Sequence, residues 1–347
     1  MKSFKVGTFH INQKSKIFLI AECGVNHNGK LSYAYKLIDE AKKSGFDAVK
    51  FQTYIPNLLV HSSAHLAIYQ KKTKFSNQKK MLEKYFLSFE NFSKLNEYCK
   101  KKKIIFLSTP FDNVSAKFLN SIKIPAFKIS SADLDNFHLL KFIKKFKKPI
   151  ILSTGMSNQN RIDKTLKFLN IKKTNLALMH CVSEYPTKIS NSNLGYLKIL
   201  KKKKLPIGIS DHSNDTIVPY SSSALGIKLI EKHITLSNSM DGPDHIASLE
   251  VKKLKSFVKN IRDIEFSLND NLKKISREEI NNLKAVSRKI FFSKELQKNQ
   301  KITYSDIIPL RSGIKNGVTI NNLSKIVNKK VKKDVKKMEV LTWQKIK

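Results

Sequence analysis

Short apolar runs alternate with longer amphipathic stretches through the first 270 residues of the chain. Eight of these runs have the length and residue types of buried strands, and the stretches between them space their apolar residues as helices do. A TIM (β/α)8 barrel closes with eight parallel strands, each followed by a helix. The predicted strands are 17–21, 48–51, 104–107, 126–129, 149–152, 176–179, 206–209 and 229–231.

Helical stretches between the strands include 33–43, 89–101, 139–146, 161–169 and 218–225, and the stretch 254–268 follows the last strand. A doubly wound open sheet would use the same alternation of strands and helices. However, no GxGxxG motif follows the first strand, and that motif is typical of the dinucleotide-binding members of this class. We therefore predict an α/β fold with a TIM barrel over residues 1–270.

A small second domain follows the predicted barrel. The barrel uses roughly 250 residues, which leaves a remainder in a chain of 347. Residues 271–285 are polar and charged, and we predict that they form a linker. Residues 286–347 hold short extended pieces at 289–292 and 307–310, with turns at Gly313 and Gly317, so we predict a small domain there.

Residues 54–84 interrupt the alternation after the second strand. A long loop at the mouth of a barrel is commonly a lid or a wall of the substrate site. The same mixed and polar composition would also suit a variable surface loop. The sequence leaves both interpretations open.

Composition narrows the class of protein. The net charge is +39, but only five of the 66 basic residues are arginines. Proteins that read nucleic acid usually keep arginine for bidentate contacts, so we attribute the lysines to a genome rich in A and T and expect no nucleic-acid partner. No apolar run approaches the ~20 residues of a membrane span. The three cysteines form no CxxC pair, which suits reduced thiols in a soluble cytoplasmic protein without a membrane partner.

Polar or ionisable groups stand at the end of every predicted strand. In a TIM barrel the active site forms at these C-terminal ends, from side chains of several strands. One such coincidence would be weak, because strand ends often carry polar turn formers. In strand order, the groups are Glu22; Lys50 and Gln52; Ser108 and Thr109; Lys128, Ser130 and Ser131; Ser153 and Thr154; His180 and Ser183; Ser210, Asp211 and His212; Glu231 and His233.

Two histidines, His212 and His233, end the seventh and eighth strands, which are neighbours in a closed barrel. Carboxylates lie close to them in sequence at Asp211, Glu231 and Asp244. A set of histidine and oxygen ligands with open positions suits Mn²⁺, Mg²⁺, Fe²⁺ or Co²⁺ better than structural Zn²⁺. The alternative is that the histidines only form hydrogen bonds in the core, and we favour the metal.

Two lysines, Lys50 and Lys128, lie within apolar runs, where an unpaired ammonium group is costly. This placement indicates a binding site for a phosphate or carboxylate group, with the hydroxyl groups of nearby serine and threonine residues as further donors. Cys181 directly follows His180, but neighbours along a strand point to opposite faces. We therefore expect a buried thiol there and no Cys–His nucleophile.

The strand-end motifs together resemble the sialic acid synthase family. Residues 21–29 read AECGVNHNG and are similar to the AExGxNHNG opening of that family. The other motifs follow in the family's order over nearly the whole chain. They are KFQ at 50–52, STPFD at 108–112, LSTGM at 152–156, HC at 180–181, YP at 185–186, SDH at 210–212, EKH at 231–233 and GPDH at 242–245.

The resemblance implies a synthase that condenses phosphoenolpyruvate with an N-acylated hexosamine, adds water and releases phosphate. It implies a divalent metal on His212 and His233, typically Mn²⁺, with Mg²⁺ or Co²⁺ as alternatives. The catalytic residues that it implies are Glu22, Lys50, Lys128 and Asp244. The substrate-binding residues that it implies are Gln52, Thr109, Phe111, Ser131, Ser153, Ser183, Tyr185, Ser210, Glu231 and Arg311.

The C-terminal domain resembles the antifreeze-protein-like (SAF) module of the same family. The resemblance implies a homodimer in which this domain caps the partner's barrel and presents Arg311 to the N-acyl group of the sugar. It favours an N-acetylneuraminate or N,N'-diacetyllegionaminate synthase. The alternatives are another phosphoenolpyruvate–sugar condensing enzyme or a non-catalytic carbohydrate-binding protein. Two departures from the family are Ser183, where some members have Asn, and the turn RSGIKNG at 311–317 in place of RPGNG.

Overall fold

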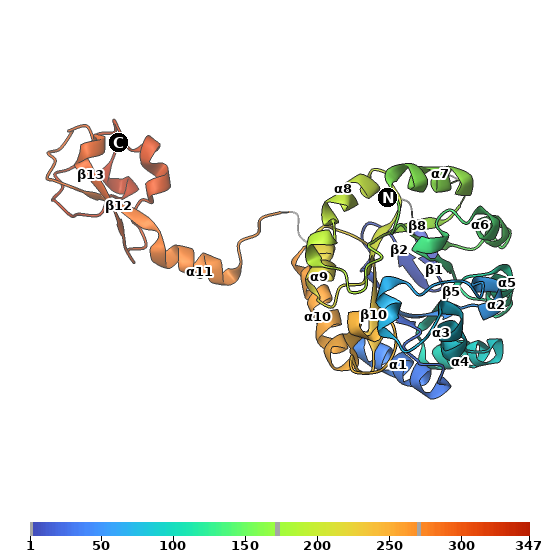
Figure 1. The fold of residues 1–347 in the computed structure, drawn as a ribbon. Helices are drawn as coiled ribbons and strands as arrows, with labels where there is room; N and C mark the ends of the chain where they lie inside the picture. The colour runs from blue at the N-terminus through green and yellow to red at the C-terminus, as the bar shows by residue number, and fades with distance from the viewer. Residues whose placement is uncertain (1–2, 171–173, 269–271) are drawn as a thin grey trace. The chain divides into compact units, whose positions relative to one another are not determined.

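The computed structural model describes residues 3–170, 174–268 and 272–347 and divides the chain into two units, Met1–Asn269 and Asp270–Lys347. The predicted boundary at residue 270 falls on residues 269–271, which lie outside the described residues. In the first unit eight consecutive strands pair in parallel, and the last strand pairs with both the first and the seventh (Figure 1). The sheet is therefore closed, and the prediction of a TIM barrel is confirmed.

The barrel elements lie close to their predicted positions. The strands are β3 (Phe18–Gly24), β4 (Ala48–Thr53), β5 (Ile105–Pro110), β6 (Phe127–Ile129), β7 (Ile150–Ser153), β8 (Leu176–Cys181), β9 (Ile207–Asp211) and β10 (Leu229–Thr235). The outer helices are α1 (Leu31–Ser44), α4 (Phe89–Lys102), α5 (Asn113–Ser121), α6 (Phe137–Lys144), α7 (Gln159–Leu169), α8 (Leu197–Lys201), α9 (Ile217–Ala224) and α10 (Val251–Ser267). A short strand, β11 (Leu249–Glu250), pairs with the end of β10.

Each barrel strand is buried on both faces, as expected where helices cover a parallel sheet. Several helices begin directly after the strand loops with side-chain caps. Asp112, Asn136 and Asn158 accept hydrogen bonds from backbone N–H groups in the first turns of α5, α6 and α7. These three caps fix the residue at which the loop after the preceding strand ends, and so they limit the length of those loops at the barrel mouth.

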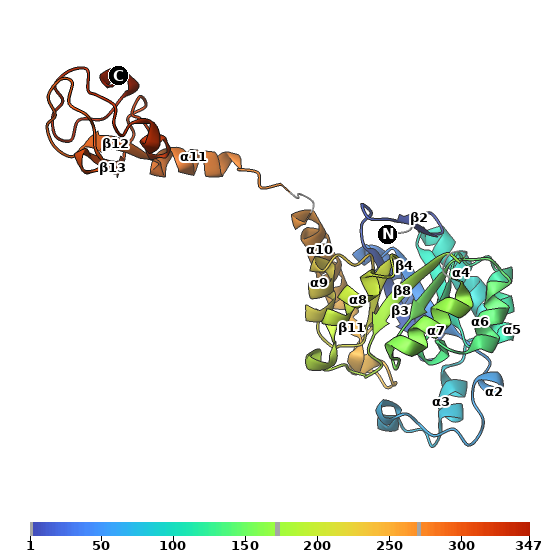
Figure 2. The same ribbon diagram turned by 90° about the horizontal axis from the view of Figure 1, so that it is seen from above.

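A β-hairpin precedes the barrel and was not among the predicted elements. It consists of β1 (Phe4–Val6) and β2 (Phe9–Ile11), paired antiparallel. Phe4, Val6 and Ile11 are fully buried and pack against side chains inside the barrel. Figure 2 shows the hairpin and the 54–84 segment at opposite ends of the barrel. The hairpin closes the N-terminal end, which leaves the C-terminal end for a site.

The 54–84 segment folds over the C-terminal end of the barrel. It contains α2 (Pro56–Leu59), the 3-10 helix η1 (Ile68–Lys72) and most of α3 (Gln78–Tyr85). Tyr54, Met81 and Tyr85 form a small core with Val25, which follows β3. This small core attaches the segment to the barrel, so the segment has a defined position over the barrel end.

The second unit contains a helix where the sequence predicted only a linker. Helix α11 (Arg277–Val286) begins with a capping box between Ser276 and Glu279, and all of its side chains are exposed. Two antiparallel strands follow, β12 (Arg288–Phe292) and β13 (Ile307–Arg311), around an apolar core of their own. Within the described ranges of the whole chain, no helix combines the length and the apolar character that a bilayer crossing requires.

Candidate active site

A cavity of about 1000 Å³ opens at the C-terminal ends of the barrel strands. The catalytic, substrate-binding and metal-binding residues that the family resemblance implied all line it, except Asp244 and Arg311. Asp244 is buried close behind the lining side chains, near His233. Arg311 belongs to the second unit, where it is exposed at the end of β13.

Alternation along the strands decides which polar groups reach the cavity. In β9 and the residue after it, Ser210 and His212 face the cavity, whereas Asp211 faces away and forms an ion pair with Lys232. Asp211 was considered as a metal ligand because it is next to His212 in sequence. Its position on the opposite face of the strand keeps it out of the cavity.

Buried charges form the floor of the cavity. The Nζ atom of Lys50 lies 2.7 Å from Glu22 Oε2 and 3.8 Å from Glu231 Oε2. Lys128 Nζ lies 3.5 Å from Glu231 Oε1 and donates a hydrogen bond of 2.6 Å to Ser153. Both lysines lie within apolar runs of the sequence, and each has a buried carboxylate partner. Two cations and two anions compensate one another here, which offsets the cost of burying them.

The protonation equilibria in this cluster suit proton transfer near neutral pH. Burial raises the pKa of Glu22 to about 7, against the opposing effect of Lys50. Burial also lowers the pKa of Lys128, although the charge of Glu231 partly offsets it. A carboxyl group whose pKa is close to 7 can accept and release a proton at the pH of a cell.

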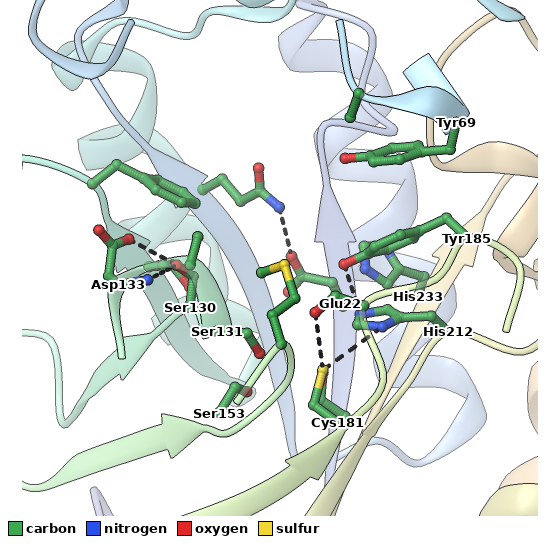
Figure 3. A pocket seen from close by; sticks show the side chains of 18 of the residues that line it. Glu22, Tyr69, Ser130, Ser131, Asp133, Ser153, Cys181, Tyr185, His212 and His233 are labelled. Carbon is green, nitrogen blue, oxygen red and sulfur yellow. Dashed lines mark hydrogen bonds between the residues drawn. The ribbon is translucent and has the colours of Figure 1, made fainter. Parts of the chain in front are cut away.

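The histidine side of the cavity is an aromatic stack (Figure 3). The Nδ1–H of His212 donates to the carbonyl of Val182 at 2.8 Å, which leaves Nε2 as an acceptor. The Tyr185 hydroxyl donates to that Nε2 atom at 3.0 Å. The rings of His212 and His233 have centroids 5.3 Å apart, and Tyr69 of the 54–84 segment stacks on Tyr185 at 4.6 Å.

His233 is suited to binding a cation in its neutral form. Burial lowers its pKa well below the usual value, and its Nδ1 atom finds no hydrogen-bond partner among the described residues. Asp244 Oδ2 lies 3.9 Å from that atom, and burial raises the pKa of Asp244 to about 6. Gly24 makes this approach feasible, because a Cβ atom there would lie 3.3 Å from both Asp244 Oδ2 and His233 Cε1.

The donor set fits a metal that takes few ligands from the protein. Among the residues that the structure describes, no group of three or more His, Cys, Asp or Glu side chains has the arrangement to hold a metal ion. In their neutral forms, the imidazoles of His212 and His233 can supply two nitrogen ligands. A divalent ion there would therefore need substrate or water oxygens to complete its coordination.

Serine hydroxyl groups gather on the other side of the cavity from the histidines (Figure 3). Ser131 accepts a hydrogen bond of 2.9 Å from the backbone N–H of Gly155. A Cβ atom on Gly155 would lie 2.5 Å from Ser183 Oγ and 2.8 Å from Ser131 Oγ. Only glycine therefore lets the two serines converge. Lys128 and its partner Ser153 line the same cavity, and together these groups can hold a phosphate group.

Among the cavity residues that the sequence did not predict, two lie on the histidine side, Cys181 and Tyr69. The Cys181 sulfur lines the cavity and lies 3.8 Å from His212 Nδ1, while the neighbouring His180 bonds to the carbonyl of Ser192 instead. Strand alternation predicts that Cys181 and His180 do not pair. The contact of Cys181 with His212 could not be predicted in this way, because it depends on how neighbouring strands are aligned in the barrel. Tyr69 carries no sequence signal beyond its place in the 54–84 segment.

The NHNG motif holds the loop that carries Asp244. Asn26 donates hydrogen bonds of 2.8 Å to the carbonyl of Ile234 and to Ser248 Oγ. Asn28 donates to the carbonyl of Asp241 at 2.9 Å and bonds through its Oδ1 to His245. The motif therefore ties the loop after β3 to the loop after β10.

Comparisons with known proteins agree with this geometry. The chain matches the NeuB family over residues 37–273 and the SAF domain over residues 288–347. It is 38% identical to the N,N'-diacetyllegionaminic acid synthase of Campylobacter jejuni, over 94% of this chain and 99% of that one. It is 36% identical to the protein of the same name from Legionella pneumophila, over 95% and 94%. The crystal structure of an N-acetylneuraminic acid (sialic acid) synthetase from Leptospira borgpetersenii superimposes with a TM-score of 0.71 at 30% identity, over 81% of this chain and 95% of that one.

His27 of the NHNG motif should make the barrel less stable in acid. Burial lowers its pKa to about 3, whereas a histidine in the unfolded chain titrates near 6.5. The unfolded chain therefore binds a proton that the folded chain excludes, and stability falls as the pH drops below about 6.5. At pH 5 this difference costs about 2 kcal/mol.

His27→Gln should therefore lose less unfolding free energy than the parent between pH 7.5 and pH 5, by about 2 kcal/mol. Urea unfolding followed by circular dichroism at both pH values measures the difference. His10→Gln is the matched control, because His10 is exposed on the hairpin. The same pH dependence in His27→Gln and the parent would contradict the prediction.

Proposed function

Because the chain belongs to the NeuB family, we propose that it is a phosphoenolpyruvate-dependent synthase that makes a nonulosonic, sialic-type acid from an N-acylated hexosamine. The observation that carries the proposal is one cavity with two chemically different sides. Serine hydroxyl groups and Lys128 suit a phosphate on one side, and Glu22 with two histidines suits a polar carbonyl compound and water on the other.

The reaction joins the two substrates with addition of water. The methylene carbon of phosphoenolpyruvate forms a bond to the aldehyde carbon of the open-chain sugar, and positive charge develops at the former enol carbon. The aldehyde oxygen takes up a proton and becomes a hydroxyl group. Water adds to the former enol carbon and gives up its protons, the bond between this carbon and the phosphate oxygen breaks, and inorganic phosphate leaves as the carbon becomes a ketone. Lys128, Ser131 and Ser153 hold the phosphate group before and after this step, by charge and by hydrogen bonds. The hydrogen bond between Lys128 and Ser153 positions both groups for this contact.

Glu22 acts as the general base for the water. Its pKa of about 7 allows it to be ionised in a large fraction of molecules at neutral pH. Lys50, 2.7 Å away, stabilises the ionised form, and Gln52 approaches the other carboxylate oxygen at 3.5 Å. These two neighbours orient the carboxylate towards the cavity.

His212 and His233 would hold a divalent cation, Mn²⁺ by preference, with Mg²⁺ or Co²⁺ as alternatives. When bound, such an ion polarises the aldehyde of the sugar as a Lewis acid. The protein's own contribution is orientation. The hydrogen bond from His212 Nδ1 to Val182 fixes the ring and keeps the lone pair of Nε2 facing the cavity.

The sugar that we propose is a 2,4-diacetamido-trideoxyhexose, and the product is then N,N'-diacetyllegionaminate. Support comes from the two relatives of that name. It also comes from the 54–84 segment, which brings apolar side chains to the cavity wall at Leu59, Val60 and Ile68. A sugar with methyl and acetyl groups in place of hydroxyl groups would bury them against such a wall. N-Acetylmannosamine is the second candidate, supported by the crystal structure of the sialic acid synthetase.

Phosphate release should separate these sugars. With phosphoenolpyruvate and Mn²⁺, kcat/KM for the diacetamido sugar should exceed that for N-acetylmannosamine by about 10–200-fold, the range for one apolar group in a pocket. Mass spectrometry identifies each product. Val60→Thr, which keeps the shape and adds a hydroxyl group, should reduce the preference. Preference for N-acetylmannosamine would reject only the choice of sugar, whereas no phosphate release with any N-acylated hexosamine would reject the synthase.

Glu22→Gln should bind phosphoenolpyruvate with unchanged affinity but turn over about 10²–10⁴ times more slowly, because it removes a general base and keeps the shape. Calorimetry measures the binding, and phosphate release measures the rate. Glu184→Gln is the matched control, since Glu184 also lines the cavity but is partly exposed. A rate within tenfold of the parent would rule out the assigned role.

We also propose a homodimer in which the SAF domain of one chain caps the barrel of the other and presents Arg311 to the sugar. The support within the chain is helix α11, whose Ile280, Leu283 and Val286 are three residues apart and 43–55% exposed. This spacing places them on one face of the helix. An apolar face of this kind is suited to burial against a second surface.

Complementation between inactive variants tests the dimer. His212→Ala inactivates the site in the barrel, and Arg311→Ala inactivates the capping domain. If chains of the two variants are refolded together, random pairing should restore about a quarter of the parent's activity, because half of the dimers have one complete site out of two. Gel filtration verifies the mixed dimers. Mixed dimers without activity would show that each chain caps its own barrel.

A further inference from the structure

Lys232 is a buried lysine that the proposed reaction does not use. It lies in β10 between Glu231 and His233, and its side chain is 0% exposed. Its Nζ atom lies 2.6 Å from Asp211 Oδ2 and also contacts the carbonyl of Ser213. Lys232 is therefore fully engaged outside the cavity, in the layer between strands and helices.

Asp211 extends this contact into the turn after β9. Its Oδ1 atom accepts the backbone N–H of Ser213 at 3.1 Å, and its Oδ2 atom accepts the Ser213 hydroxyl at 2.9 Å. The two residues that flank His212 are thus both bound by Lys232. Lys232 holds the backbone on either side of the histidine.

The ion pair and the two histidines lie on opposite faces of the same two strands. Lys232 and Asp211 are partners in the parallel pairing of β10 with β9. Each is followed directly by a histidine that faces the opposite side, His233 in one strand and His212 in the other. The pair therefore joins the two strands at the level where the imidazoles stand.

Stability alone does not account for such a pair. The desolvation of two buried charges offsets most of their attraction, and apolar side chains of similar volume often serve equally well. What an ion pair with further hydrogen bonds adds is a fixed geometry, because its atoms must meet at defined distances and angles. Residues behind metal-binding histidines commonly set metal affinity in this way.

We propose that Lys232 and Asp211 are positioning residues that set the spacing of His212 and His233, and thereby the affinity of the protein for a divalent metal ion. The inference rests on the two-histidine site of the proposed function. It assigns to the EKH and SDH motifs a shared role: the middle residues join the strands behind the sheet, and the last residues face the cavity.

The test measures Mn²⁺ binding to the full-length, metal-stripped protein by calorimetry and by electron paramagnetic resonance of free Mn²⁺. Lys232→Met and Asp211→Asn should each weaken binding by about 10–100-fold, the usual effect of residues behind metal ligands. His212→Ala should abolish binding in the same assay.

A double variant separates positioning from folding. Lys232→Met leaves the Asp211 charge buried without its partner, which can destabilise the barrel. Lys232→Met with Asp211→Asn removes both charges, so its melting temperature should recover towards that of the parent. Its Mn²⁺ affinity should stay as weak as in the single variants, because the join between the strands is still absent.

The matched control is Arg262→Met. Arg262 forms an ion pair with Asp47, which directly precedes β4, at the opposite end of the barrel from the histidines. This variant should lower the melting temperature and leave Mn²⁺ affinity unchanged. An Mn²⁺ affinity of the double variant equal to that of the parent would overturn the positioning role and leave the proposed function intact. Failure of the parent itself to bind Mn²⁺ would overturn both the metal site and this inference.

Discussion

Closure of the eight-stranded sheet forces alternate residues of every strand towards one axis, and the rest of the site depends on this constraint. Side chains from β3 to β10 meet at one end because parallel strands all finish there. The other end is filled by the N-terminal hairpin, with Phe4 and Ile11 inserted into the barrel. The open end can therefore carry polar groups that a core would exclude.

Such a crowded polar site is stable only if its charges compensate. Lys50 and Lys128 share Glu231, and Lys50 also meets Glu22, so each buried cation has a buried anion within 4 Å. The same burial that requires the pairing raises the pKa of Glu22 to about 7. One desolvated cluster thus both holds the charged groups of the cavity floor together and keeps a carboxyl group that can exchange a proton near neutral pH.

Glycines act as spacers in this arrangement. Gly24 leaves room for Asp244 beside His233, and Gly155 leaves room for Ser131 beside Ser183. Both glycines belong to sequence motifs, at 21–29 and 152–156, that also contain polar residues of the site. Their role is visible only when the side chains from other strands are in place.

The barrel, the order of its strands and the polar groups that the strand ends bring to the cavity could be predicted from the sequence alone. Strand periodicity and strand ends are local properties, so Glu22, Lys128, His212 and His233 could be assigned to one end of one fold before any contact was known. The sequence also predicted correctly that His180 and Cys181 would not pair, since strand neighbours face opposite sides. It did not indicate the hairpin or helix α11, whose short, weakly periodic segments resemble loops.

Which of these groups contact one another depends on the tertiary structure. The pairing of Lys50 with Glu22, the contact of Cys181 with His212 and the stacking of Tyr69 on Tyr185 join residues far apart in the chain. It also turned Asp211 from a candidate ligand into the partner of Lys232 behind the sheet. The physical reason is that strand alternation fixes the face on which a side chain lies, whereas its partner is fixed by the register between strands, which closure of the barrel sets.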